Sequence, residues 1–136
     1  MRGLNGALSS DSAQSLFARL VLQELSSGVL GWAAVMKTEQ AYCGHVFLGN
    51  HSRDERSIEI GFVLSKSFHR RGFATEMAAA VRDYARLQLG CKIVRATVDE
   101  DNVRSRTVLA RIGMSVASRR HDDSGAYLVY QDEAEE

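Results

Sequence analysis

A short segment between residues 69 and 75 has the residue types that bind phosphate groups. It reads His-Arg-Arg-Gly-Phe-Ala-Thr and comes directly before a predicted helix. The start of a helix exposes about four unpaired backbone N–H groups and has roughly half a positive charge. Gly72 and the small Ala74 would let a ligand approach the backbone, and Arg70 and Arg71 would add full charges. The segment predicts a phosphate or pyrophosphate site, although an ordinary basic loop before a helix has the same composition.

The elements around this segment decide where such a site would lie. Residues 57–64 alternate as a strand does, with Ile58, Ile60, Phe62 and Leu64 on one face and Glu59, Gly61 and Val63 on the other. Residues 73–89 have a helical period, with apolar positions at Met77, Ala80, Val81, Tyr84 and Leu87. Further patterns predict helices over 11–27 and 102–112, and strands over 31–37, 44–49, 92–98, 114–119 and 126–131. We therefore expect an α/β (α+β) fold with a mixed sheet, which the helix over 73–89 crosses in a right-handed connection.

Composition limits the class of protein. The 136 residues suggest a single domain, 1–136, and 17 basic residues balance 17 acidic ones, so a nucleic-acid partner is not expected. No apolar run approaches the ~20 residues of a membrane span, and we expect neither a membrane partner nor a secretory signal. Two cysteines and four histidines show no metal-ligand spacing, which predicts no metal and a cytoplasmic protein with reduced thiols. The acidic residues from Asp132 to Glu136 are typical of a solvated terminus.

A second motif lies about 30 residues after the first. Asn102-Val103-Arg104-Ser105 is followed by Val108-Leu109-Ala110-Arg111-Ile112-Gly113-Met114. With the segment Gly72-Phe73-Ala74-Thr75-Glu76, this pattern resembles the GNAT superfamily of acetyl-CoA-dependent N-acetyltransferases, and within it the branch of ribosomal-protein-alanine and spermidine acetyltransferases. The resemblance is strongest over 57–114. Neither G-x-G-x-x-G nor G-x-x-x-x-G-K-[ST] occurs, so a nucleotide-binding protein that uses the same turn is a weaker alternative.

The resemblance implies a mostly antiparallel, twisted sheet with flanking helices, without the family's usual first strand and helix. It also implies acetyl-CoA as co-substrate. The segment from Arg70 to Thr75, with Gly72, Phe73 and Ala74 inside it, would hold the pyrophosphate. The strand over 57–64 would splay from the next one, so that the backbone of Phe62, Val63 and Leu64 binds pantetheine and accepts charge from the thioester oxygen. His69 departs from the family's usual Gln or Arg at the start of this turn.

The same resemblance suggests groups for proton transfer. Glu59 lies where the family commonly has a carboxylate, and would act as general base directly or through water; its alternative is an ordinary strand carboxylate. Many relatives have a Tyr general acid where this chain has Leu109, so Ser105 is the nearest hydroxyl that could protonate the thiolate or hold cofactor. Asn102 would bind pantetheine, cap its helix, or do both. Weaker candidates are Tyr127 and Tyr130 as donors and His45 in the acceptor cleft, all more often structural.

These residues favour an enzyme that acetylates a primary amine of a small molecule or peptide. An acyl-CoA-binding module with little or no activity is the alternative, because Leu109 stands where the family has Tyr and no counterpart of the family's first strand and helix is predicted. Either residues 1–10 replace these elements in a reduced form, or the sequence is truncated. Exposed edge strands are compatible with a homodimer. The identity of the acceptor amine stays open among protein N-termini, polyamines, antibiotics and small metabolites.

Overall fold

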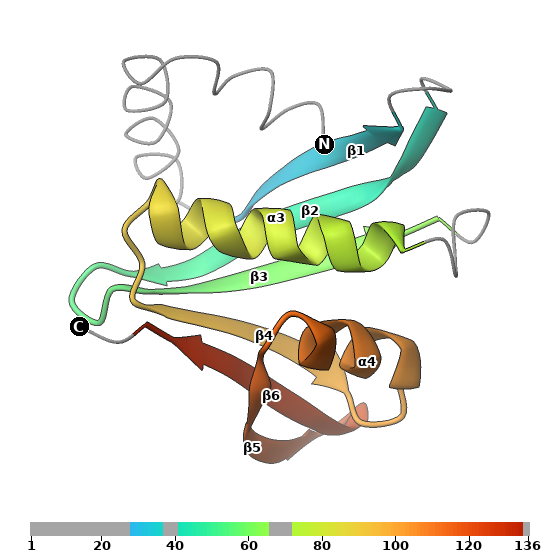
Figure 1. The fold of residues 1–136 in the computed structure, drawn as a ribbon. Helices are drawn as coiled ribbons and strands as arrows, with labels where there is room; N and C mark the ends of the chain where they lie inside the picture. Colours follow the sequence, from blue (N-terminus) through green and yellow to red (C-terminus); the bar gives the residue numbers. More distant parts are fainter. Residues whose placement is uncertain (1–27, 37–40, 66–71, 135–136) are drawn as a thin grey trace.

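The computed structural model describes residues 28–36, 41–65 and 72–134, and Figure 1 shows their arrangement. The helix predicted over 11–27 and most of the predicted turn over 65–72 lie outside these residues. The described elements are β1 (Leu30–Met36), β2 (Ala41–Ser52), β3 (Ser57–Leu64), α3 (Phe73–Leu87), β4 (Ile93–Asp99), α4 (Val103–Arg111), β5 (Ser115–Asp122) and β6 (Gly125–Glu133). Their type and order agree with the sequence-based prediction.

The six strands form one sheet in the order β1-β2-β3-β4-β6-β5. Every neighbouring pair is antiparallel except β3 and β4, which are parallel. The predicted mixed, mostly antiparallel sheet with flanking helices is therefore confirmed. Both helices connect parallel strands and lie on the same side of the sheet (Figure 1), as right-handed crossovers require.

The parallel strands β3 and β4 separate soon after they meet. Their register contains only three pairs, from Ser57 with Ile93 to Glu59 with Arg95. Strand β3 stays paired with β2 as far as Leu64, which lies opposite Gly44. One backbone edge of β3 after Glu59 therefore has no neighbouring strand, and this is the splay that the family resemblance implied.

The core lies between α3 and the sheet. Strand residues such as Ile58 and Ile60 are almost fully buried, and they face a helix surface made of Met77, Ala78, Val81, Tyr84 and Ala85. The predicted apolar face of this helix was partly wrong, because Leu87 is 75% exposed. The small Ala78 and Ala85 face the sheet instead, where small side chains let the helix pack closely. Burial also raises the pKa of the Tyr84 hydroxyl to about 12.

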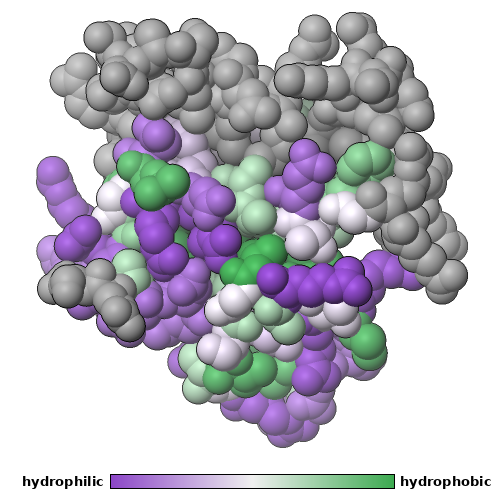
Figure 2. Space-filling view, in the orientation of Figure 1, coloured by the Kyte–Doolittle hydropathy of each residue, from purple (hydrophilic) through white to green (hydrophobic). Residues whose placement is uncertain are grey.

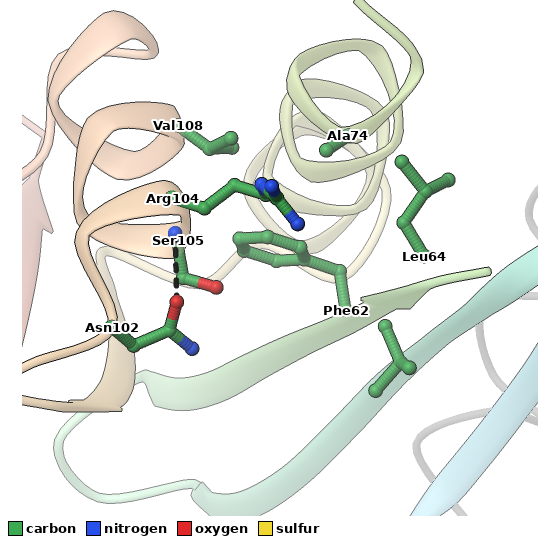
Figure 3. Close-up of a pocket in the computed structure, with 8 residues that line it drawn as sticks. Phe62, Leu64, Ala74, Asn102, Arg104, Ser105 and Val108 are labelled. Carbon is green, nitrogen blue, oxygen red and sulfur yellow. Dashed lines mark hydrogen bonds between the residues drawn. The ribbon is translucent and has the colours of Figure 1, made fainter. Parts of the chain in front are cut away.

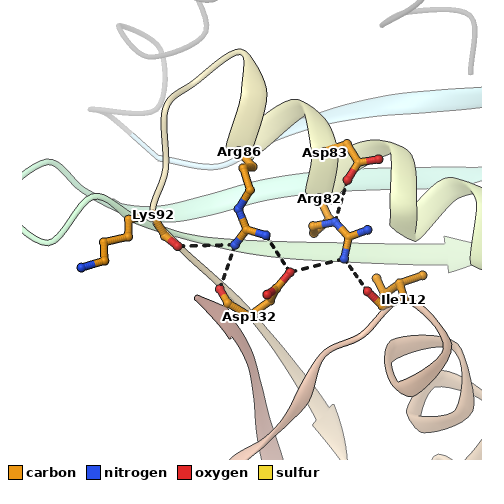
Figure 4. A network of polar contacts seen from close by, with 6 residues as sticks. All are labelled: Arg82, Asp83, Arg86, Lys92, Ile112 and Asp132. Carbon is orange, nitrogen blue, oxygen red and sulfur yellow. Dashed lines mark hydrogen bonds and ion pairs between the residues drawn. The ribbon is translucent and has the colours of Figure 1, made fainter. Parts of the chain in front are cut away.

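A cluster of charged residues fixes α3 to the end of β6 (Figure 4). The Arg86 guanidinium lies 2.8 Å from a carboxylate oxygen of Asp132 and also donates to the Asp132 carbonyl oxygen. Arg82 pairs with the same carboxylate at 3.4 Å and donates to the carbonyl oxygen of Ile112. The prediction of a solvated acidic end was therefore wrong for Asp132, which ties the last strand to α3.

Element boundaries differ from the prediction mainly in the hairpins. Strand β2 begins at Ala41 and continues to Ser52, well beyond the predicted 44–49. Its polar end was predicted as loop because Asn50 to Ser52 have no apolar alternation, yet Ser52 still pairs with Ser57. Strands β5 and β6 are also longer than predicted, so that only Asp123 and Ser124 separate them.

Candidate functional site

The gap between β3 and β4 opens into a cavity of about 250 Å³ on the helix side of the sheet (Figure 3). One wall is the free end of β3, and the others are the first turns of α3 and α4. Its lining residues are Phe62, Val63, Leu64, Ala74, Asn102, Arg104, Ser105 and Val108. Six of them were predicted as site residues from the sequence, and the fold brings them together from three separate segments.

A second cavity of about 380 Å³ continues from the first toward the start of α3. The two share Leu64, Ala74, Arg104 and Val108. The second adds Gly72, Thr75, Val103, Thr107 and Arg111. Figure 2 shows a hydrophobic patch near the centre of this face, bordered by hydrophilic residues. The groove is thus apolar near β3 and cationic along α4.

The start of α3 has the conformation that an anion site requires. Gly72 has φ of +78°, in the left-handed region, and no side chain caps the helix at this residue. A Cβ built on Gly72 meets no described atom within 4 Å, so the glycine is needed for its backbone angle and not for lack of space. The N–H groups of Ala74 and Thr75, in the first turn, therefore have no acceptor within the helix. Arg70 and Arg71 lie outside the described residues.

Asn102 and Ser105 form the opposite wall. The Asn102 side-chain oxygen accepts a hydrogen bond of 3.2 Å from the backbone N–H of Ser105, which is a helix N-cap. The cap holds both side chains at the cavity, and the Ser105 hydroxyl points toward Phe62 in Figure 3. The cap is thus observed, and it leaves the Asn102 amide nitrogen and the Ser105 hydroxyl available to a ligand.

Glu59 lies on the other face of the sheet, away from these two cavities. Thr97 donates a hydrogen bond of 2.7 Å to one of its carboxylate oxygens, and the Asn50 side-chain amide donates to the other. All three residues line an open hollow of about 600 Å³, to which β2 to β6 and the turn before β3 contribute residues. Glu59 is also the last residue of β3 that pairs with β4, at Arg95, so it marks the point where the gap begins.

The structure thus divides the predicted site between two faces. Most of the described cofactor candidates, and Ser105, line the helix-side cavities, although the Val63 side chain belongs to the far face, and Glu59 lies on that opposite side of the same gap. Phe73 is half-buried against the core at the first helical position. The gap between the strands is the place where groups from both faces could meet.

The weaker candidates lie apart from the helix-side cavities. Leu109 is 1% exposed in the core, and Tyr130 is buried with its hydroxyl 3.3 Å from the Arg106 guanidinium. Tyr127 lines the hollow on the far face. His45 lies opposite Val63 on that face, and its Nδ1 is 2.7 Å from the Tyr42 hydroxyl.

Some lining residues were missed by sequence reasoning. Arg104, Val108 and Arg111 follow one another at helical spacing, so their common face on α4 was present in the sequence as a signal. Asn50 and Thr97, which hold Glu59, gave no such signal because they belong to different strands. Their positions depend on the register of the sheet.

Two further chemistries have little support among the described residues. Cys91 is buried, and this burial raises the pKa of its thiol, which disfavours the thiolate that a nucleophile needs. Within residues 28–36, 41–65 and 72–134, no group of three His, Cys, Asp or Glu side chains could hold a metal ion. No helix in the same ranges is both long and apolar enough to cross a bilayer.

Known proteins resemble this chain in sequence and fold. A family model described as "Acetyltransferase (GNAT) domain" matches residues 1–115. The uncharacterized N-acetyltransferase YnaD of Bacillus subtilis (strain 168) is 28% identical over 80 residues, which are 59% of this chain and 46% of that protein. The chain therefore spans about half the length of this curated relative.

Solved structures show the same fold at lower identity. A ribosomal-protein-S5-alanine acetyltransferase from Vibrio fischeri has a TM-score of 0.74 and 16% identity, over 85% of this chain and 67% of that one. A variant of a spermidine N-acetyltransferase from Vibrio cholerae has a TM-score of 0.72 and 13% identity, over 91% and 76%. At these identities the likeness concerns the fold alone.

Proposed function

The chain belongs to the GNAT acetyltransferase family, and from this premise we propose that it transfers an acetyl group from acetyl-CoA to a primary amine, as one domain of residues 1–136. The main support is the separation of β3 from β4 beside a continuous groove that ends at the start of α3. The amine, of a peptide or a small molecule, attacks the thioester directly in a ternary complex.

The groove fits the cofactor in both shape and polarity. The apolar part beside Phe62 and Val108 suits pantetheine, and the unpaired edge of β3 offers backbone groups to its amides. The first turn of α3 offers N–H groups to the pyrophosphate, and Arg104 and Arg111 add positive charge along the groove. The Asn102 amide is a further polar contact at the narrow end.

The two proton transfers of the reaction would take place on opposite faces of the sheet. Glu59 takes a proton from the amine on the far face, directly or through water, as the nitrogen attacks the carbonyl carbon in the gap. A backbone N–H of the segment from Phe62 to Leu64 donates to the oxyanion that forms. On the helix side, Ser105 donates a proton to the departing thiolate or holds the cofactor. Thr97 and Asn50 keep the Glu59 carboxylate in place.

The pKa of the acceptor amine determines how much free energy its deprotonation costs. At pH 7.5, deprotonating a lysine-type amine with a pKa near 10.4 costs about 4 kcal/mol, whereas an α-amino group near 7.8 costs under about 1 kcal/mol. The α-amino group thus needs less help from a single carboxylate base. We therefore favour an α-amino group as the acceptor.

A binding module for acyl-CoA with little or no turnover is the second candidate. One observation favours it: the position where many relatives have a Tyr general acid is occupied by Leu109, which is buried in the core. Acetyl-CoA binding without acetyl transfer to any amine would support this candidate.

The test is steady-state acetyl transfer to peptide amines by the wild-type chain and by Glu59→Gln. We expect about 100-fold lower turnover in the variant, with acetyl-CoA affinity within twofold of wild type. Glu133→Gln is the matched control, because Glu133 is an exposed strand carboxylate that does not line the hollow, and the substitution removes the same charge. Full activity of Glu59→Gln, with an unchanged pH profile, would remove Glu59 from the mechanism.

A further inference from the structure

The far-face hollow has an anionic end and a cationic end. Its charged lining residues are two carboxylates and two guanidinium groups, from Glu55, Glu59, Arg95 and Arg120. Two of these neutralise each other, because a guanidinium nitrogen of Arg95 lies 3.7 Å from a carboxylate oxygen of Glu55 and its Nε donates to Gln131 at 3.1 Å. Glu59 and Arg120 have no such ion pair among the described residues.

Glu59 is held by neutral groups only. Its hydrogen bonds come from the Thr97 hydroxyl and the Asn50 amide, and among the described residues no cationic side chain forms an ion pair with it, because its cross-strand neighbour Arg95 pairs with Glu55. The β3 end of the hollow therefore attracts a cation, such as the protonated form of an acceptor amine.

Arg120 supplies the opposite charge at the β5 end. Arg120 and Tyr127 are direct cross-strand partners of β5 and β6, and both line the hollow. Neither side chain has a hydrogen bond or ion pair with another described residue, although the carboxylates of Asp99 and Asp122 lie at neighbouring positions on the same face. Cross-strand partners have Cβ atoms about 5 Å apart. A guanidinium and a phenolic hydroxyl at this spacing can donate together to one carboxylate.

We propose that the hollow binds an acceptor with two charges, with its amino group at Glu59 and an anionic group at Arg120 and Tyr127. This inference rests on the proposed N-acetyltransferase function and narrows its acceptor class. It favours a peptide amino-terminus that has an acidic side chain nearby. It disfavours a polyamine, which would bring a second positive charge to Arg120.

The strand order gives the spacing between the two charges. Glu59 and Arg120 lie three strands apart, or about 14 Å across the sheet, and about four residues apart along it. The two offsets place the Cα atoms about 20 Å apart, and side chains that lean toward each other reduce the span between the charged groups to about 10–15 Å. An extended peptide covers this span with two or three residues and the length of a glutamate side chain. The acidic side chain would thus be at the third or fourth position of the peptide.

The test compares two amidated peptides, Ala-Gly-Glu-Gly and Ala-Gly-Lys-Gly, with spermidine as a third probe. Binding to the full chain is measured by calorimetry in saturating CoA, so that no acetyl transfer occurs. We expect the acidic peptide to bind about tenfold more tightly than the basic one, and more tightly than spermidine. Arg120→Gln should remove this preference, and Arg120→Glu should reverse it.

Arg119→Gln is the matched control. Arg119 is the preceding residue on β5, points to the helix-side face and pairs with Glu100 there, so its replacement should leave the preference intact. Equal binding of the two peptides, no binding of either at millimolar concentration, a preference for spermidine, or the same loss in both variants would overturn the inference.

Acetyl transfer measured with the same probes separates this inference from the proposed function. Turnover without charge preference would overturn the inference and leave the N-acetyltransferase assignment in place. Charge preference in binding without turnover of any amine would support the anion site and contradict the assignment.

Discussion

Replacing Gly72 with alanine should weaken acetyl-CoA binding far more than it destabilises the fold. The added methyl group meets no described atom within 4 Å, so the stability cost comes from the backbone angle of +78°. A left-handed conformation costs a non-glycine residue about 1–2 kcal/mol, and the less flexible unfolded chain returns about half of this. The net loss is about 1 kcal/mol, or about 4 °C in Tm for a domain of this size.

Gly90→Ala is the matched control for this prediction. Gly90 follows the other end of α3 with φ of +70°, and its built Cβ also meets nothing within 4 Å. The two variants should therefore lose the same stability by thermal unfolding. Only Gly72→Ala places a methyl group where the pyrophosphate approaches the first turn of the helix.

The expected binding loss follows from the hydrogen bonds at risk. Loss of one hydrogen bond from a backbone N–H group to a charged phosphate costs about 1.5–3 kcal/mol, which corresponds to about 10- to 100-fold weaker binding. Calorimetric titration of acetyl-CoA into each variant measures it. Equal acetyl-CoA affinity in Gly72→Ala and Gly90→Ala would refute the placement of the pyrophosphate at the start of α3.

Two further predictions concern stability. In Gly44→Ala the new Cβ would lie 2.0 Å from the carbonyl oxygen of Val63, so β2 and β3 must shift apart. We expect the free energy of unfolding, measured with urea, to fall by about 2–4 kcal/mol. Gly61→Ala, whose Cβ makes only ordinary contacts, should lose under about 1 kcal/mol. Because burial raises the pKa of Tyr84 to about 12, its folded form keeps a proton that the unfolded form loses above about pH 10. The free energy of unfolding should therefore fall between about pH 10 and 12, with a slope below the ~1.4 kcal/mol per pH unit that release of one full proton would give. Tyr84→Phe should flatten this slope. The same slope in the variant and the wild type would contradict the assignment of this pH dependence to Tyr84.

The sequence was informative where one local rule determined the structure. Strand β3 alternates cleanly between apolar and other residues, and its bounds agree with the prediction at both ends. Gly72 and Gly90 mark the two ends of α3, because a helix end in the left-handed region favours glycine. The second motif predicted the cap that Asn102 provides to Ser105.

The sequence did not predict the features that depend on tertiary structure. The face of α3 was misjudged, because Leu87 is the more apolar residue while Ala78 and Ala85 fit the short distance to the sheet. Asp132 looked like part of a charged terminus, and only the packing of α3 against β6 gives it two arginine partners. The division of the site between two faces follows from the gap after Glu59, which depends on strand register.

Titration of the purified 136-residue chain with acetyl-CoA, with ATP as the control ligand, tests the central claim most directly. The groove between β3, α3 and α4 predicts binding that is selective for acetyl-CoA, because it joins an apolar channel to a phosphate site. Absence of acetyl-CoA binding by the folded chain, or equal affinity for ATP, would contradict the proposed acetyl-CoA site.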